Sequence, residues 1–275
     1  MPPVQQHAPA SEGWSPPVDS HVHTEWSWDA PRGSMERSCE IAIEVGLPAI
    51  AFTEHADWAL VHEGQHPVDL AGYFDAVERC RAKFKGLKIL TGVELGEPHW
   101  FPKETAQVLA AGPLDHVLGS IHCVRLDGVM VDASQFPERA VDFPAAVREY
   151  FRETLAMIES GQPFETLAHV DYPKRYWLEG AAPYREADYE AEIRAVLKAA
   201  ARTGRVLEVN TTRGHVLCPD ITVVRWWREV GGQAVQYASD AHQPDKVAAG
   251  FKLATQMVEA AGFKPARDPM ALWRR

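Results

Sequence analysis

The residues best suited to chemistry in this sequence are histidines and carboxylates at the ends of short apolar segments. His21 and His23 are spaced two apart, so both side chains leave an extended strand on the same face. The complete set comprises six histidines and three carboxylates: His21, His23, Asp29, His55, Glu94, His122, His169, Asp240 and His242. Imidazole and carboxylate groups without thiolates are typical ligands of Zn, Mn or Fe. We therefore predict a metal site built from these side chains.

The number of ligands indicates how many ions the site holds. A catalytic metal usually keeps about three protein ligands and an open position, so this set suffices for two or three ions with one carboxylate as a bridge. Three divalent ions beside three carboxylates leave a net charge of about +3, which suits a phosphate dianion. Metals about 3.5–4 Å apart also produce a hydroxide nucleophile and hold both ends of an in-line displacement. The residues alone thus favour hydrolysis of a phosphoester.

Such a site needs elements that bring the side chains to one rim. Seven apolar segments are typical of buried strands: 17–23, 47–53, 88–94, 116–121, 165–170, 205–210 and 234–239. Helical patterns alternate with them, one from Ser34 to Gly46 and another beginning at Asp142. Functional side chains of β/α barrels gather at the carboxyl ends of the strands. We therefore predict a single-domain α/β fold, a seven-stranded β/α (TIM-like) barrel. An open doubly wound sheet is the alternative, weakened because no GxGxxG follows the first strand.

The composition excludes several classes of protein. The chain has 275 residues, 12 His, 4 Cys and a formal net charge of -10, which argues against a dedicated nucleic-acid-binding protein. No apolar run approaches the roughly 18 residues of a membrane span. Residues 1–17 are rich in Pro, Ala and Gln and lack the features of a signal peptide, so we predict a disordered tail before one barrel domain over residues 18–275. Scattered, reduced cysteines and the missing signal predict a cytoplasmic location.

With their neighbours, the predicted ligands form a series of motifs: His21-Val-His23, Asp29, Thr-Glu-His55, Gly-Val-Glu94, Ser-Ile-His122, Ala-His169 and Ser-Asp240-Ala-His242. In this order they resemble the motifs of the polymerase and histidinol-phosphatase (PHP) family, over essentially the whole chain after residue 17. The resemblance implies a distorted seven-stranded β/α barrel with a trinuclear metal centre.

The resemblance also implies which side chains share an ion. One metal would be held by four of them: His21, His23, Glu94 and Asp240. A second would be bridged by Glu94 and held also by His122 and His169. The third would be held by Asp29, His55 and His242. Some relatives have His at the position of Asp29, and the harder Asp ligand favours Fe or Mn over Zn there.

Within the family, the chain looks most like the histidinol-phosphate phosphatases. The supporting segments are Glu94-Leu-Gly, His169-Val-Asp-Tyr-Pro-Lys174-Arg175-Tyr and Glu208-Val-Asn210-Thr-Thr-Arg213. The likeness implies a phosphomonoesterase that converts L-histidinol phosphate to L-histidinol and phosphate in histidine biosynthesis. A metal-bridging hydroxide, held by Glu94, Asp240 and the histidine ligands, would attack phosphorus in line with the ester oxygen. The identities of the three divalent ions (Zn, Mn or Fe) and the oligomeric state stay open.

Cations near the strand ends are candidates for binding the free phosphate oxygens. Lys174 and Arg175 follow the strand that carries His169, and Arg213 follows the strand that supplies no ligand. Arginine can hold two phosphate oxygens at once, and the family likeness favours Arg213 and Arg175 over Lys174. The general acid for the leaving group is left open among four loop histidines: His62, His66, His99 and His215.

Other functions remain open at this point. A PHP phosphoesterase acting on another small phosphate monoester would use the same ligands, and so would a phosphodiesterase or exonuclease acting on nucleotides or DNA. The latter needs a longer basic groove than the densest basic run, Arg81–Lys88, supplies. An amidohydrolase-type C–N hydrolase commonly carries a carboxylated lysine on the strand that here ends in His122. A catalytically dead metal-binding module tends to lose ligands, whereas all of them are present here.

Overall fold

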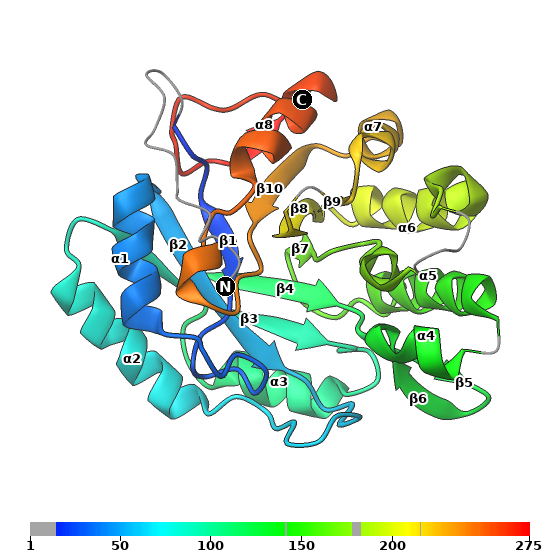
Figure 1. Cartoon of the computed structure of the whole chain (residues 1–275), viewed down its shortest axis with the longest axis horizontal. Helices are drawn as coiled ribbons and strands as arrows, with labels where there is room; N and C mark the ends of the chain where they lie inside the picture. Colours follow the sequence, from blue (N-terminus) through cyan, green and yellow to red (C-terminus); the bar gives the residue numbers. More distant parts are fainter. Residues whose placement is uncertain (1–14, 141, 178–182, 215) are drawn as a thin grey trace, which may run out of the picture.

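Seven parallel strands form the centre of the computed structural model, which describes residues 15–140, 142–177, 183–214 and 216–275 (Figure 1). They are β1 (Asp19–Val22), β2 (Ala49–Ala56), β3 (Lys88–Gly96), β4 (His116–Ser120), β7 (Thr166–Leu167), β8 (Val206–Arg213) and β10 (Ala234–Ala238). Each corresponds to one of the predicted segments. The seven strands therefore confirm the strand prediction, although their ends differ by a few residues.

The strands close into a barrel. They are hydrogen-bonded in the order β10-β1-β2-β3-β4-β7-β8, and β8 pairs with β10 in parallel from Leu207↔Val235 to Asn210↔Ala238. The barrel is distorted at β7, which joins β4 and β8 through two residues only, Thr166 and Leu167. The predicted seven-stranded, TIM-like barrel is thus confirmed, and the open doubly wound sheet is excluded because the edge strands pair.

The strands are buried because they face the barrel interior on one side and helices on the other. All eight residues of β2 are buried. Helix and strand also approach closely where the Tyr73 hydroxyl donates to the Phe52 carbonyl oxygen (2.7 Å) and accepts from the Gly92 N–H (2.8 Å). A Cβ at Gly92 would press on the Thr53 side chain and on the His116 carbonyl, so glycine is required between these strands.

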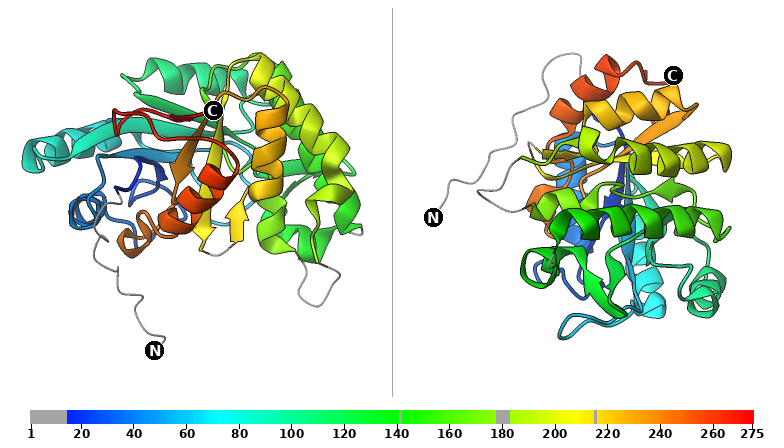
Figure 2. Two further views of the ribbon diagram at one scale, coloured as in Figure 1. Left: turned by 90° about the horizontal axis from the view of Figure 1, so that it is seen from above. Right: turned by 90° about the vertical axis from the view of Figure 1, so that its right-hand side faces the viewer.

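The helices surround the barrel (Figure 2). They are α1 (Met35–Val45), α2 (Leu70–Lys83), α3 (Pro102–Ala110), α4 (Phe136–Arg139), α5 (Phe143–Glu159), α6 (Glu190–Arg202), α7 (Ile221–Glu229) and α8 (Phe251–Ala260). Their caps agree with the sequence: Ser34 Oγ accepts from the Arg37 N–H, Gly46 takes φ 78°, and Asp142 accepts from the Ala145 N–H. In both figures α1 lies beside α2, and α5 beside α6.

Several short elements were not predicted. They are β5 (Cys123–Leu126), β6 (Val129–Asp132), β9 (Val216–Cys218), β11 (Trp273–Arg274) and the 3-10 helices η1 (Ala133–Gln135), η2 (Tyr172–Tyr176), η3 (Glu186–Tyr189) and η4 (Pro244–Lys246). Strands β5 and β6 form an antiparallel hairpin around Asp127 and Gly128, whose φ angles of 50° and 82° suit a tight turn. The Asp-Gly pair was a local signal for this hairpin.

The predicted N-terminal tail lies mostly outside the described residues, which begin at Ser15. Pro16 and Pro17, directly before the predicted boundary at residue 18, are buried, and the boundary itself stays a prediction. Disorder of residues 1–14 stays a prediction. Among the described residues, every helix is too short or too polar to span a bilayer. The four cysteines are all buried and free, as predicted.

Candidate metal centre and substrate pocket

The carboxyl ends of the barrel strands bring the nine predicted ligands together at one rim. His21, His55 and Glu94 are in β1, β2 and β3, and the others follow β1, β4, β7 or β10 within a few residues. Seven of them are buried, while Asp29 and His242 are partly exposed at the mouth. The sequence prediction of a shared rim is therefore confirmed as a matter of placement, and the role of each side chain as a metal ligand stays a prediction.

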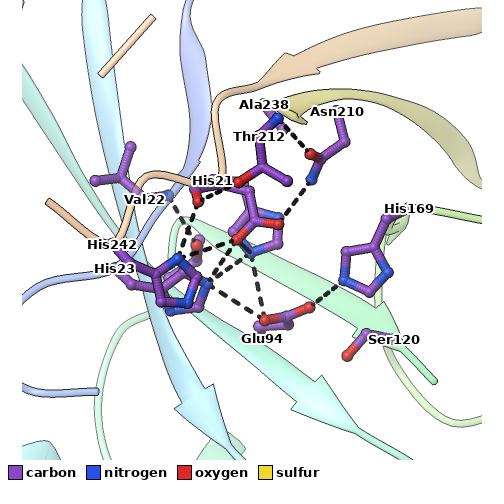
Figure 3. A network of polar contacts seen from close by, with 12 residues as sticks. His21, Val22, His23, Glu94, Ser120, His169, Asn210, Thr212, Ala238 and His242 are labelled. Atoms are coloured by element: carbon purple, nitrogen blue, oxygen red, sulfur yellow. Dashed lines mark hydrogen bonds and ion pairs between the residues drawn. The ribbon is translucent and has the colours of Figure 1, made fainter. Parts of the chain in front are cut away.

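The first cluster consists of His21, His23, Glu94 and Asp240, of which the first three are labelled in Figure 3. The two imidazole Nε2 atoms are 2.9 Å apart. Glu94 Oε2 lies 3.3 Å from Nε2 of His21 and 3.4 Å from Nε2 of His23, and Asp240 Oδ1 lies 3.4 Å from the latter. Two ligands held 2.0–2.2 Å from one ion are roughly 3–3.6 Å apart, so these separations fit a single ion between the four groups.

The second cluster uses the other oxygen of Glu94. Glu94 Oε1 lies 2.7 Å from His169 Nε2 and 3.2 Å from His122 Nε2. The two carboxylate oxygens of Glu94 thus face different sets of imidazoles, with His169 on the far side from His23 (Figure 3). This is the arrangement required of a carboxylate that bridges two metals.

The third cluster lies at the mouth of the site. Asp29 Oδ2 is 3.0 Å from His242 Nε2 and 3.4 Å from His55 Nε2. His55 also connects this cluster to the others, because its Nδ1 lies 3.1 Å from Glu94 Oε2 and its ring stacks on His23 with centroids 4.1 Å apart. Three overlapping groups have ligand atoms close enough to hold an ion: His23 with His55 and His242, His21 with His23 and Asp240, and His55 with Glu94 and His122. Because His23 and His55 each belong to two groups, the division of the ligands among three ions stays a prediction.

A layer of polar side chains behind the imidazoles aims their Nε2 atoms inward. Glu208 Oε2 lies 2.9 Å from His21 Nδ1, and Ser27 Oγ lies 3.0 Å from His23 Nδ1. Ser27 Oγ in turn donates to Glu54 Oε2 at 2.6 Å. Hydrogen bonds of this kind set the tautomer and orientation of metal-binding histidines. Sequence reasoning assigned no role to Ser27, Glu54 or Glu208.

Two further carboxylates support His122. Asp57 Oδ1 lies 3.7 Å from His122 Nδ1, and Asp57 Oδ2 lies 3.4 Å from His55 Nδ1. Glu97 Oε1 accepts hydrogen bonds from the backbone N–H groups of His122 (2.5 Å) and Cys123 (2.7 Å). Burial raises the pKa of Glu97 to about 8. The only sequence signal for these residues was their position within three residues of a predicted ligand.

The backbone is strained at two predicted ligands. His169 has a backbone φ of 20° and Asp240 a φ of 50°, values that residues other than glycine rarely adopt. Such conformations persist where surrounding contacts impose them, often at functional sites. Here the His169 N–H donates to Glu208 Oε1 (3.1 Å), and the Asp240 N–H donates to the His21 carbonyl oxygen (2.8 Å). These bonds turn both side chains into the centre.

The buried charges of the site, and its buried polar atoms that lack a hydrogen-bond partner, are suited to binding cations. Glu94 Oε2, Asp29 Oδ1 and the Nδ1 atoms of His55 and His169 are buried without a hydrogen-bond partner. Burial opposes ionisation of Glu94, but the histidines around it, His21 foremost, hold the pKa of this carboxyl well below its usual range. A buried charge is stable only when it is paired or coordinates a metal. Imidazole nitrogens and carboxylate oxygens are the donors that Zn, Mn and Fe accept, so the residues present fit these ions.

A cavity of about 290 Å³ opens above the centre. Both predicted arginines line it: Arg175 forms an ion pair with Asp240 (Nη2 to Oδ2, 2.9 Å), and Arg213 packs over the Tyr176 ring. Lys174 does not line this cavity, because its Nζ donates to Glu186 Oε1 at 2.6 Å. The expectation that Lys174 contacts phosphate is therefore not supported by its position.

The four loop histidines that were candidates for the general acid differ in their position relative to the cavity. His62 lines the cavity. His66 is exposed and bonds to the Pro67 carbonyl oxygen at 3.1 Å, and His99 pairs with Glu153 at 2.9 Å away from the cavity lining. His215 lies outside the described residues.

Known proteins share this architecture. A crystal structure of histidinol phosphate phosphatase from Lactococcus lactis subsp. lactis, in complex with zinc, L-histidinol and phosphate, superposes with a TM-score of 0.80 at 23% identity and covers 94% of this chain and 99% of its own. The structure of a putative histidinol phosphatase from Listeria monocytogenes gives a TM-score of 0.69 at 18% identity, with 86% of this chain and 99% of that chain covered. These likenesses show the fold.

Sequence comparison extends over the same length. A probable histidinol-phosphatase from Clostridium acetobutylicum is 29% identical over 259 residues, which is 90% of this chain and 94% of that protein. Histidinol-phosphatase from Lactococcus lactis subsp. lactis is 26% identical over 252 residues, 90% of this chain and 91% of its own. The profile of the PHP domain matches residues 19–212, from the first residue of β1 to the last but one of β8. The chain therefore belongs to the PHP domain family.

Proposed function

We propose that this protein is a metal-dependent phosphomonoesterase that hydrolyses L-histidinol phosphate to L-histidinol and phosphate, a reaction of histidine biosynthesis. The observation that carries the proposal is the arrangement of Glu94, whose two oxygens face two imidazole clusters beneath a cavity lined by Arg175 and Arg213. The relatives named histidinol-phosphatase, which match about nine tenths of the chain, support the choice of substrate.

The proposed cofactors are three divalent ions of Zn, Mn or Fe. His21, His23, Glu94 and Asp240 would hold one, and Glu94 would share a second with His122 and His169. A third would be held by Asp29, His55 and His242. When bound, such ions supply Lewis acidity toward phosphate oxygens and activate water as a nucleophile.

The chain's own groups would hold the phosphate and its charge. Arg175 lines the cavity and is buried beside Asp240, and this ion pair restricts the side chain before a phosphate binds, which lowers the entropy cost of ordering it. Arg213 is more exposed and rests on Tyr176, which leaves its guanidinium free to close over a bound anion. The guanidinium groups of Arg175 and Arg213 are permanently charged, and they would stabilise the negative charge on the phosphate oxygens that the metals leave free.

The proposed partner is a small phosphorylated molecule, and we do not expect a nucleic-acid strand to enter the cavity of about 290 Å³. The basic run Arg81–Lys88 does not extend such a path, because Arg81 bonds to the Ile89 carbonyl oxygen and to Asp115. Four buried free cysteines suit the reducing interior of a cell, so we place the enzyme in the cytoplasm.

A phosphate-release screen tests the function. Enzyme reconstituted with Zn, Mn or Fe would be assayed on L-histidinol phosphate, other phosphate monoesters, bis-p-nitrophenyl phosphate and single-stranded DNA. We expect the highest kcat/KM for L-histidinol phosphate, and losses of several orders of magnitude in His122→Ala and Asp240→Ala. A clear preference for another monoester would replace the substrate, and a preference for the diester or DNA would replace the class of reaction.

A further inference from the structure

One part of the cavity lining carries no predicted metal or phosphate ligand. It is formed by Trp28, His62 and Asp132, which we call the outer wall. These residues come from the loops that follow β1 and β2 and from the end of the β5–β6 hairpin, which follows β4. None of the three was among the predicted metal or phosphate ligands. Their convergence on one side of a substrate cavity calls for a ligand group that lies beyond the phosphate.

Asp132 is held in place by the hairpin. It pairs with Cys123, the residue after His122, and the Ala133 N–H donates to the His122 carbonyl oxygen at 2.8 Å. Its Oδ1 accepts from the Ser134 N–H at 2.7 Å, whereas Oδ2 faces His62 Nε2 at 3.4 Å. The side chain is only 9% exposed, so this carboxylate is fixed near the metal centre with one oxygen turned to the cavity side.

His62 is held by its loop and by Trp28. Gln65 Oε1 accepts from the N–H groups of Val61 (2.9 Å) and His62 (3.2 Å), which closes the loop around the histidine. The imidazole stacks on the Trp28 ring with centroids 5.4 Å apart and planes 20° apart. The hydrogen bond to Asp132 raises the pKa of His62, and the other charged groups facing it are His122 and Asp29. Trp28 Nε1 is buried without a hydrogen-bond partner.

The outer wall adds a negative charge that forms no ion pair with an arginine among the residues that the structure describes. Arg175 pairs with Asp240 elsewhere in the lining, whereas Asp132 stands at the end of the hairpin opposite the His62 ring. A buried carboxylate beside flat rings is suited to a cationic or N–H-bearing group, and it disfavours an apolar or anionic one because the carboxylate would lose its hydration without gaining a partner.

We propose that Asp132 and His62 form a specificity site that binds the leaving group and selects one carrying a protonated amine or an N–H-bearing ring. This inference rests on the proposed function, because L-histidinol carries both groups. Asp132 would accept a hydrogen bond from the substrate nitrogen, and His62 would hold the carboxylate in position and contact the leaving group beside Trp28. The site acts on binding of the alcohol portion and leaves the phosphate contacts unchanged.

The test compares two substrates in Asp132→Asn. Asparagine keeps the Oδ1 acceptor for the Ser134 N–H, so the turn at η1 is preserved while the charge is removed. The substrates are L-histidinol phosphate and p-nitrophenyl phosphate, whose leaving group has no N–H. We expect kcat/KM for L-histidinol phosphate to fall about 10- to 100-fold, the loss of one hydrogen bond to a charged group, and kcat/KM for p-nitrophenyl phosphate to change less than about threefold.

The matched control is Asp127→Asn, which removes the same charge from the exposed turn of the same hairpin, where φ 50° also suits asparagine. It should leave the ratio of the two kcat/KM values unchanged. Product inhibition gives a second readout: Asp132→Asn should weaken inhibition by L-histidinol and leave inhibition by inorganic phosphate unchanged. If Asp132→Asn does not fold, His62→Ala takes its place, because His62 caps none of the described helices. It should shift the ratio of the two kcat/KM values in the same direction.

Two outcomes would overturn the inference. Equal losses on both substrates in Asp132→Asn and His62→Ala would show that the outer wall supports the site as a whole, and unchanged kinetics in both would show that it makes no contact with the leaving group. Failure of the proposed function looks different, because it appears in the wild-type enzyme as an absence of phosphate release from L-histidinol phosphate.

Discussion

Replacing Glu208 with Gln should weaken metal binding without changing the shape of the site. Glu208 is fully buried, with Oε2 facing His21 Nδ1 at 2.9 Å and Oε1 accepting from the His169 N–H (3.1 Å) and Asn210 Nδ2 (2.8 Å). A glutamine can keep the second oxygen in place, but its amide nitrogen then meets His21 Nδ1. Two donors cannot pair, so His21 must present a lone pair at Nδ1 and carry its proton on Nε2. That proton occupies the nitrogen that faces Glu94 and would otherwise bind a metal.

The size of the effect follows from the bond that is lost. A hydrogen bond to a charged group contributes about 1.5–3 kcal/mol, and each 1.4 kcal/mol corresponds to a factor of ten. We therefore expect the metal dissociation constant of Glu208→Gln to rise about 10- to 100-fold, the range typical of partners behind metal-binding histidines.

The assay is a competition between the protein and a chelator of known affinity, followed by elemental analysis of the protein. Glu165→Gln is the control, since Glu165 also accepts a backbone hydrogen bond (Val117 N–H to Oε2, 2.9 Å) but lies at the start of β7, away from the centre. Metal affinity equal to that of the wild type in Glu208→Gln, or an equal loss in both variants, would refute the reasoning about His21.

Three other predictions follow from the same contacts. Arg175→Ala should lower kcat/KM by about 10- to 100-fold in steady-state assays, because it removes a charged hydrogen-bond donor, worth about 1.5–3 kcal/mol, from the cavity that is proposed to bind phosphate. Gly96→Ala should reduce the free energy of unfolding in urea by about 1–3 kcal/mol, because the added Cβ would overlap the Asp57 carboxylate. Burial lowers the pKa of His116 to about 4, so the native protein binds fewer protons than the unfolded chain, and this contribution to stability is complete above pH 6.5 and is lost as the pH falls toward 4. When the pH is lowered to 5, the free energy of unfolding measured in urea should fall by about 2 kcal/mol more for the wild type than for His116→Gln.

Each of these predictions has a result that contradicts it. Inhibition by inorganic phosphate that is as strong in Arg175→Ala as in the wild type would remove Arg175 from the phosphate site. Gly86→Ala, where an added Cβ meets nothing within 4 Å, is the control for Gly96→Ala, and equal stabilities of the two variants would exclude the predicted overlap. Parallel pH profiles of the wild type and His116→Gln would show that His116 is protonated in the native state.

The barrel and its rim were predictable because local patterns carry the information. A strand buried on both faces needs a run of apolar residues, and parallel strands place their carboxyl ends together, so ligands such as His55 and Glu94 could be placed on one rim from the sequence alone. The weakest strand prediction was 165–170, of which β7 keeps Thr166 and Leu167. The chain leaves the ladder there because Ala168 is followed by the positive φ of His169.

The supporting contacts could not be predicted because they join distant parts of the chain. Glu208 and His21 are 187 residues apart, and no local pattern indicates that their side chains meet. Lys174 and Arg175 show a second limit. They are neighbours in η2, but one pairs with Glu186 and the other with Asp240, because the direction of each side chain depends on which acid the fold brings near it.

Metal titration of the metal-free protein tests the central claim most directly. Chelator-treated enzyme would receive Mn, Zn or Fe in increasing equivalents, with phosphate release from L-histidinol phosphate measured at each step. The proposed set of nine ligands around Glu94 predicts no activity without metal and a rise that reaches its plateau near three equivalents per chain. Full activity in the metal-free protein, or a plateau at a single equivalent, would contradict a trinuclear phosphatase.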